Sequence, residues 1–228
     1  MRISQRHSWQ VTTIEARAIQ AELASEVSRI GTITKPRYIA GVDISVNRFS
    51  KMGKGVAVVL SYPDLKVVDV QVVTDQITFP YVPGLLSFRE APLLLKAFEK
   101  LNITPDIVMV DGQGVAHPRR CGIASHLGLI LGIPTIGCAK SRLCGEHEMP
   151  SIKAGNYAEL TDNGEVIGAV LRTREDVKPL YVSIGHMIDL PTAIRWVLAC
   201  CRGYRLPEPT RLAHQAAGGN LKTAVALH

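Results

Sequence analysis

Three carboxylates of this chain lie in surroundings that do not by themselves explain a charge. Asp43 lies in the middle of an apolar run, Asp111 ends a second apolar run, and Glu90 lies between them in the sequence. A carboxylate in an apolar run is stable only if it meets water, a metal ion or a charged partner. If all three converge at one edge of a sheet, they repel one another unless a cation lies between them. Mg²⁺ suits such oxygen ligands, and Mn²⁺ can substitute for it.

The chemistry that these ligands predict is phosphodiester cleavage. Two divalent ions about 4 Å apart activate water and stabilise the leaving oxygen in such a reaction. Lys140 follows a short apolar run and would stabilise charge that develops on the phosphate, and His214 would ligate a metal ion or orient the attacking water. Arg119 and Arg120 follow Asp111 closely and would suit a phosphate. Together these residues predict a metal-dependent nuclease.

Each of the three acids also has a simpler structural interpretation. Asp43 could lie on the solvated face of an edge strand, and Asp111 could cap a turn. Glu90 could close a capping box with Ser87, although Pro92 would then lie too far into the helix to be free of cost.

The basic residues have simpler interpretations as well. Lys140 could be an ordinary solvated lysine. A histidine on the surface of a helix is the interpretation that the sequence by itself favours for His214, and surface positions are equally favoured for His117 and His186. His126 is expected along a helix face.

The segment Pro80-Tyr81-Val82-Pro83-Gly84 is stiff and partly apolar. One function of such a loop is to act as a wedge that is pushed between base pairs. The alternative is a loop at the edge of the sheet with Tyr81 packed down, and the sequence by itself favours this alternative.

Composition limits the class of protein. The chain has 228 residues and 46% hydrophobic content, so we expect one domain over residues 1–228 with a mobile tail from about residue 218. Its net charge of +6 favours a polyanionic partner. The five cysteines are odd in number and include no CxxC pair, unlike a disulfide framework or a zinc site. No signal peptide or membrane-spanning run is apparent in the sequence, and we expect a monomeric cytoplasmic protein without a membrane partner.

The predicted elements form a mixed α/β sheet. Thr12 and Glu15 predict a capping box for an opening helix, whose apolar spacing continues to Ile30. Three strands with short links then predict an antiparallel meander, and the helix–strand–helix–strand order that follows predicts parallel strands flanked by helices. A doubly wound sheet fits less well, because the first strands lack crossover helices. The expected strands are 38–46, 55–61, 66–77, 106–111, 135–138, 157–160, 165–172 and 180–184, and the expected helices are 85–101, 121–131, 189–203 and 210–217.

Several motifs of the chain resemble those of the endonuclease V family, inosine-directed nucleases that repair deaminated adenine in DNA. The resemblance spans most of the chain, and its most specific part runs from the predicted wedge to Glu90. The matching stretches are IAGVD at 39–43, PYVPGLLSFRE at 80–90, VDG at 110–112, HPRR at 117–120, PTIGCAK at 134–140 and GYRLPEPTR at 203–211.

The resemblance implies a ribonuclease H-like fold and a set of site residues. It implies that Asp43, Glu90 and Asp111 bind the metal, that His214 completes the set and that Lys140 lies at the phosphate. It also implies that Tyr81 separates the strands and that the flipped hypoxanthine enters a pocket built largely from backbone groups. The substrate-binding residues are then Tyr81, Pro83, Gly84, Leu85, His117, Gly122, Ile123 and Leu143.

The reaction implied by the resemblance is a nick at the second phosphodiester 3′ to deoxyinosine, which leaves a 5′-phosphate and a 3′-hydroxyl. The expected partner is DNA that contains deoxyinosine. Two alternatives stay open at this stage: an endoribonuclease specific for inosine in RNA, and a non-catalytic binder of damaged nucleic acid. Because all three acids are present, the sequence argues against the binder.

Overall fold

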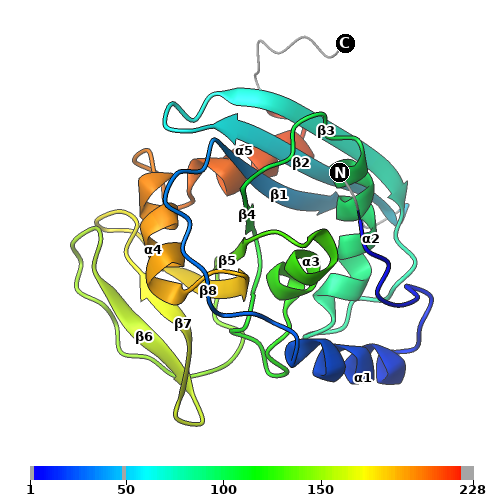
Figure 1. Ribbon diagram of the computed structural model, residues 1–228, viewed down its shortest axis with the longest axis horizontal. Helices are drawn as coiled ribbons and strands as arrows, with labels where there is room; N and C mark the ends of the chain where they lie inside the picture. Colours follow the sequence, from blue (N-terminus) through cyan, green and yellow to red (C-terminus); the bar gives the residue numbers. More distant parts are fainter. Residues whose placement is uncertain (1–2, 48–49, 222–228) are drawn as a thin grey trace.

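The computed structural model describes residues 3–47 and 50–221. This part of the chain forms one eight-stranded sheet with five α-helices, in the strand order β3-β2-β1-β4-β5-β8-β7-β6 (Figure 1). The strands are β1 (Tyr38–Val46), β2 (Met52–Ser61), β3 (Val67–Gln76), β4 (Ile107–Val110), β5 (Thr135–Ala139), β6 (Tyr157–Asp162), β7 (Glu165–Leu171) and β8 (Leu180–His186). The helices are α1 (Thr13–Ala24), α2 (Leu86–Glu99), α3 (Ile123–Leu131), α4 (Leu190–Ala199) and α5 (Glu208–Ala217).

The first half of the sheet is the antiparallel meander that the sequence predicts. β1 pairs with β2, and β2 pairs with β3. On its other side β1 pairs with β4, so it is an interior strand. The interpretation of Asp43 as a residue of a solvated edge strand is therefore wrong.

The centre of the sheet is parallel. β1, β4 and β5 are parallel neighbours, and α2 and α3 lie in the long connections that parallel pairing requires. β8 then pairs antiparallel with β5, and the β6–β7 hairpin turns at Asn163 and Gly164, which both have the positive φ of a tight hairpin turn. This topology confirms the mixed sheet and excludes the doubly wound alternative.

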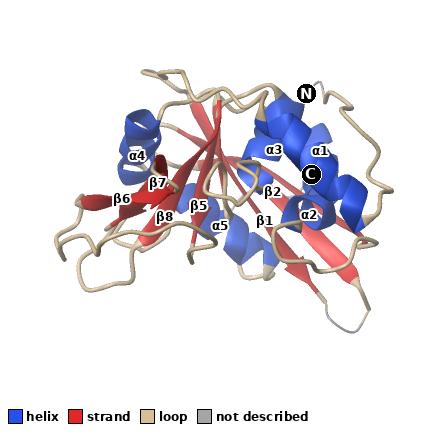
Figure 2. Cartoon of the chain, turned by 90° about the horizontal axis from the view of Figure 1, so that it is seen from below, coloured by secondary structure: helices blue, strands red, loops and turns tan. Residues whose placement is uncertain are grey.

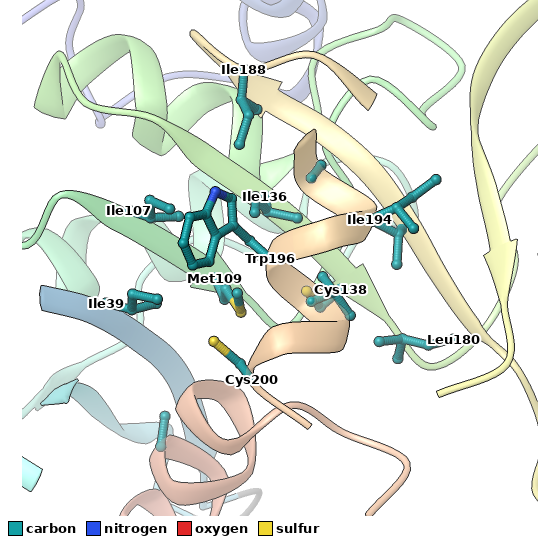
Figure 3. Packing of buried hydrophobic residues seen from close by; sticks show 14 of the residues in the cluster. Ile39, Ile107, Met109, Ile136, Cys138, Leu180, Ile188, Ile194, Trp196 and Cys200 are labelled. Atoms are coloured by element: carbon teal, nitrogen blue, oxygen red, sulfur yellow. The ribbon is translucent and has the colours of Figure 1, made fainter. Parts of the chain in front are cut away.

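Helices cover both faces of the sheet. α2 and α3 bury Leu94, Phe98 and Leu127 against one face, and α1 packs beside α3 (Figure 2). α4 and α5 cover the opposite face, where Trp196 of α4 packs with residues such as Met109 of β4 (Figure 3). Side chains at the carboxyl ends of β1 and β4 are therefore within reach of both helical layers.

Every helix differs from its predicted range at one end or both, by only one or two residues in α2 and α3. α1 has the predicted capping box but ends at Ala24, because the next residues leave the helix and bond to the chain beyond β8. The carbonyls of Ser28 and Gly31 accept hydrogen bonds from the backbone N–H groups of Met187 and Asp189 there. α4 ends at Ala199 rather than near Gly203, and α5 begins two residues before the predicted start.

The tail beyond α5 lies mostly outside the described residues, which end at 221. Its predicted mobility from about residue 218 stays a prediction, and Leu221 packs against the cluster beneath α4 and α5. Within the described residues, the structure contains no helix long and apolar enough to cross a membrane.

Candidate active site

Asp43 and Asp111 are brought together by the register of the parallel strands. Val42 of β1 pairs with Val110 of β4, so the two aspartates occupy the next position on neighbouring chains. Residues two apart in a strand share a face, and a Cβ at Gly41 would lie 1.9 Å from the Pro209 carbonyl oxygen at the start of α5. Asp43 therefore points toward α5. Only a glycine at position 41 lets this helix approach β1 so closely.

His214 reaches this cluster from α5. Its Nδ1 lies 2.7 Å from Oδ2 of Asp43. Because a carboxylate only accepts, Nδ1 carries a proton in this contact. Asp43, Asp111 and His214 each offer a ligand atom within 4.8 Å of the others. His214 is exposed on α5, as expected for a surface helix histidine, but its ring is also bonded to Asp43.

Glu90 lies in α2, which begins at Leu86 after an N-cap residue that makes no side-chain bond. The capping box with Ser87 is absent from this helix, because Ser87 is buried and its hydroxyl lies 3.1 Å from Nδ1 of His126. Burial and the negative charges of Asp43 and Asp111 raise the pKa of Glu90 to about 8. Glu90 thus faces the other two acids, although it is not a member of the three-residue cluster.

Lys140 follows β5 and forms an ion pair with Asp111. Burial raises the pKa of Asp111, and the Lys140 ammonium acts against that shift. The pair shows that Asp111 is not a simple turn cap and that Lys140 is not merely solvated. Even with Glu90 protonated, two aspartates beside one lysine leave an excess of negative charge, which a divalent cation would balance. The oxygen-rich donor set fits Mg²⁺ or Mn²⁺.

A pocket of about 350 Å³ adjoins these residues, with Asp111 and Lys140 in its wall. The side chain of Tyr81 is 71% exposed, so the interpretation of a tyrosine packed down is wrong. Leu85 does not line the pocket, because its side chain is buried with Phe79 and Phe88, and Leu86 lines it instead. The other predicted residues that line it are Tyr81, Pro83, Gly84, His117, Gly122, Ile123 and Leu143.

The histidine and arginines of the 117–120 motif are bound to protein groups. His117 is buried, and its Nε2 lies 2.9 Å from the Gly84 carbonyl oxygen. Arg119 donates to the same carbonyl at 2.8 Å, and Arg120 forms ion pairs with Asp162 and Glu165. Internal acceptors thus engage part of both guanidinium groups, and the binding of a phosphate by this arginine pair stays a prediction.

Two glutamines of the pocket wall have no counterpart in the sequence analysis. Gln20 of α1 bonds to Arg119, which is 99 residues away, and Gln113 donates to the Ser141 carbonyl at 2.8 Å. No local pattern marks either residue. Only the packing of α1 against α3 and of the 111–120 loop against β5 places them in the wall.

Comparison with known proteins gives consistent matches over nearly the whole chain. A family model described as Endonuclease V matches residues 21–215. An endonuclease V from Dehalococcoides mccartyi is 53% identical over 217 residues, which cover 95% of this chain and 97% of that protein.

Solved structures agree with the sequence relatives. The crystal structure of an endonuclease V from Streptomyces avermitilis is similar with a TM-score of 0.89 and 40% identity, covering 99% of this chain and 100% of that chain. Ciona intestinalis endonuclease V, solved with a 24mer DNA that contains an inosine followed by a ribo-adenosine, has a TM-score of 0.79 and 30% identity. That match covers 92% of this chain and 97% of the Ciona chain.

Proposed function

This chain belongs to the endonuclease V family, and from that premise we propose that it is a metal-dependent repair endonuclease for deoxyinosine in DNA. One observation carries the proposal. The cluster of Asp43, Asp111 and His214 lies beside a pocket of about 350 Å³ near which Tyr81 is exposed. The residues proposed for cleavage thus lie beside a pocket that can hold an extruded base.

The metal site that we propose comprises Asp43, Asp111 and Glu90, with Mg²⁺ as the ion and Mn²⁺ as a substitute. Bound there, such an ion supplies an activated water and stabilises the leaving oxygen. The three carboxylates would balance the charge of the ion. The ion would in turn relieve the repulsion by Asp43 and Asp111 that adds to burial in raising the pKa of Glu90.

Two basic side chains complete the proposed chemistry. In the neutral form of His214, Nδ1 donates to Asp43 and the lone pair of Nε2 would accept a hydrogen bond from the attacking water. Lys140 lies beside Asp111 and would stabilise the charge that develops on the phosphate. Water attacks phosphorus and the bond to the 3′ oxygen breaks. The products are a 5′-phosphate and a 3′-hydroxyl, with the cut at the second phosphodiester 3′ to the lesion.

Recognition, in this proposal, begins with Tyr81. Its exposed ring opens the duplex, and the hypoxanthine turns out into the pocket between Gly84, Gly122 and Ile123. Extrusion costs less for a poorly paired base, so the energy of opening favours the lesion over normal pairs.

A second substrate is favoured by one observation. The DNA in the Ciona complex carries a ribo-adenosine after the inosine. An active site that accepts a ribose beside the lesion would also accept inosine in RNA. Competition between matched DNA and RNA strands in one reaction measures which nucleic acid this chain prefers.

We further propose that residues 1–228 act as one monomeric domain in the cytoplasm. The described residues form a single sheet with helices on both faces, and the five cysteines are free, as a reducing compartment would keep them. Light scattering at micromolar concentration would measure the mass in solution, and a dimer would contradict this part of the proposal.

The deciding experiment uses a labelled duplex with one deoxyinosine. Purified protein is incubated with Mg²⁺ or with EDTA, beside an Asp43→Ala variant that is shown to be folded. We expect a nick one nucleotide beyond the lesion that requires Mg²⁺ and is absent in the variant. Tight binding in EDTA without any nick in Mg²⁺ would instead support a non-catalytic binder.

A further inference from the structure

The Gly84 carbonyl at the pocket wall is held by two hydrogen-bond donors. Nε2 of His117 lies 2.9 Å and Nη2 of Arg119 lies 2.8 Å from this oxygen. A carbonyl oxygen has two lone pairs, so both are engaged. The donors belong to the 111–120 loop, whereas Gly84 ends the loop that carries Tyr81.

The hydrogen bonds of His117 fix which ring nitrogen carries the proton. Nδ1 of His117 accepts from the backbone N–H of Arg119 at 3.1 Å, so Nε2 carries the proton. Burial lowers the pKa of His117 to about 4, which keeps the ring neutral near pH 7. Both ring nitrogens are therefore used within the protein.

Helix α1 supports this contact through the side chain of Gln20. Nε of Arg119 donates to Oε1 of Gln20 at 2.8 Å, and Nε2 of Gln20 donates to the Cys121 carbonyl at 2.8 Å. Gln20 is buried, so its amide cannot exchange these partners for bulk water without moving α1.

The position of Tyr81 depends on such anchors. Its side chain is 71% exposed and so has little packing of its own. Three residues later, Gly84 has a φ of +78°, a left-handed conformation that other residues rarely adopt. A Cβ at this position would also lie 3.0 Å from Nη2 of Arg119. The conformation and the contact thus favour glycine here.

We propose that Gln20, Arg119 and His117 form a positioning clamp that sets the Tyr81 loop before DNA binds. We call these three residues the Gly84 clamp. This inference rests on the proposed function. In it, His117 acts through Gly84 rather than by touching the base, and α1 takes part in lesion recognition.

The test compares Arg119→Leu with wild type on two substrates, a duplex and a single strand that each contain one deoxyinosine. We expect the duplex KM to rise about ten-fold, the scale of a lost hydrogen bond to a charged group. The single-strand KM and the kcat at saturation should change little, because only the duplex must be opened. Arg119→Lys should recover part of the loss.

A matched control is Arg202→Leu. Arg202 also donates to backbone carbonyls, those of Ala199, Cys201 and Pro63, but it lies on the exposed turn after α4. Its ratio of duplex to single-strand activity should equal that of wild type. If Arg119→Leu fails to fold, Gln20→Leu takes its place, since it leaves His117 and the Arg119 charge intact.

A double-mutant cycle separates the clamp from a general structural role. If the clamp acts through the Tyr81 loop, Tyr81→Ala combined with Arg119→Leu should lose no more duplex activity than Tyr81→Ala alone. Fluorescence of 2-aminopurine beside the lesion, measured in EDTA, should show less base extrusion in Arg119→Leu.

The outcomes are distinguishable. A wild type that does not nick the deoxyinosine duplex overturns the proposed function, and the clamp with it. Wild-type nicking combined with equal losses on duplex and single strand, or with fully additive losses in the double mutant, overturns the clamp alone.

Discussion

At the scale of single residues, the positions of Asp43 and Asp111 are determined by the pairing of their strands. Asp43 follows Val42 and Asp111 follows Val110, and because these two valines are paired, both carboxylates lie at one edge of the sheet. The two are not equivalent, because Asp43 meets the imidazole of His214 and Asp111 meets the ammonium of Lys140.

Replacing either aspartate should lower nicking activity without unfolding the protein. We expect Asp43→Asn and Asp111→Asn to lower the nicking rate by about a hundred-fold or more, since even residues that only support metal ligands are worth 10–100-fold. Both variants should stay folded in EDTA, because the change removes one of several repelling charges. Single-turnover nicking assays and circular dichroism measure the two effects, and full activity in either variant would contradict the metal assignment.

Two buried histidines predict how stability depends on pH. Burial lowers the pKa of His117 to about 4 and that of His126 to about 3, below the ordinary value of 6.5. The folded state therefore holds both rings neutral, and between these values and 6.5 the unfolded state binds more protons. Stability is complete above about pH 6.5 and falls as pH drops toward 4.

The loss between pH 6.5 and 5 should be about 1.5 kcal/mol for each histidine. His126→Gln removes one titrating ring and keeps an amide that can hydrogen-bond. Urea unfolding at pH 7 and pH 5 should show a shallower pH dependence in this variant than in wild type. An equal slope in both would show that His126 does not contribute.

At the scale of elements, the approach of α5 to β1 is decisive for His214. A Cβ at position 41 would lie 1.9 Å from the Pro209 carbonyl oxygen, so α5 would have to move. We expect Gly41→Ala to cost about 1–3 kcal/mol of stability, as overpacking does, and to lower activity by moving His214 away from Asp43.

Gly155→Ala is the control for this substitution. Gly155 has a positive φ, and no atom lies within 4 Å of a Cβ built there. Its replacement should cost about 1–2 kcal/mol through backbone strain alone and leave nicking unchanged. Comparable activity losses in the two variants would show that stability, and not the place of α5, sets the rate.

The loop before α2 gives a prediction at the same scale. Tyr81→Ala should reduce activity on duplex DNA more than on single strands, because only the duplex requires strand separation. Parallel KM measurements on both substrates would detect the difference. Equal losses would count against a wedge, and would indicate instead that the ring contacts the lesion strand in both substrates.

At the scale of the whole molecule, the charge of the site is opposite to that of the chain. The site has an excess of negative charge, whereas the whole chain has a net charge of +6. The basic surface favours a polyanion, while the acid cluster favours a divalent cation. Mg²⁺ should therefore raise the thermal midpoint of wild type, by the equivalent of about 2.7 kcal/mol at a hundred-fold excess over its Kd. Asp43→Asn should abolish the rise, and a rise that persists in this variant would place the ion elsewhere.

The fold was largely predictable, because its signals are local. Capping by Thr12, the Asn163-Gly164 turn and the length of each apolar run are fixed by nearest neighbours, and the elements appear close to their predicted places. The failures lie at ends such as the one after Ala24, where hydrogen bonds to a distant segment replace those of the helix.

The sequence by itself determined the residue types of the site: acids in apolar runs, a stiff loop with a tyrosine, and a lysine after a strand. Only the tertiary structure decided their partners. The register of β1 and β4 joins Asp43 to Asp111, and the clamp joins Gln20 to Arg119 across 99 residues. The physical reason is that hydrogen bonds and charge interactions depend on distances in space. The packing of helices on the sheet sets those distances, and no local sequence pattern encodes them.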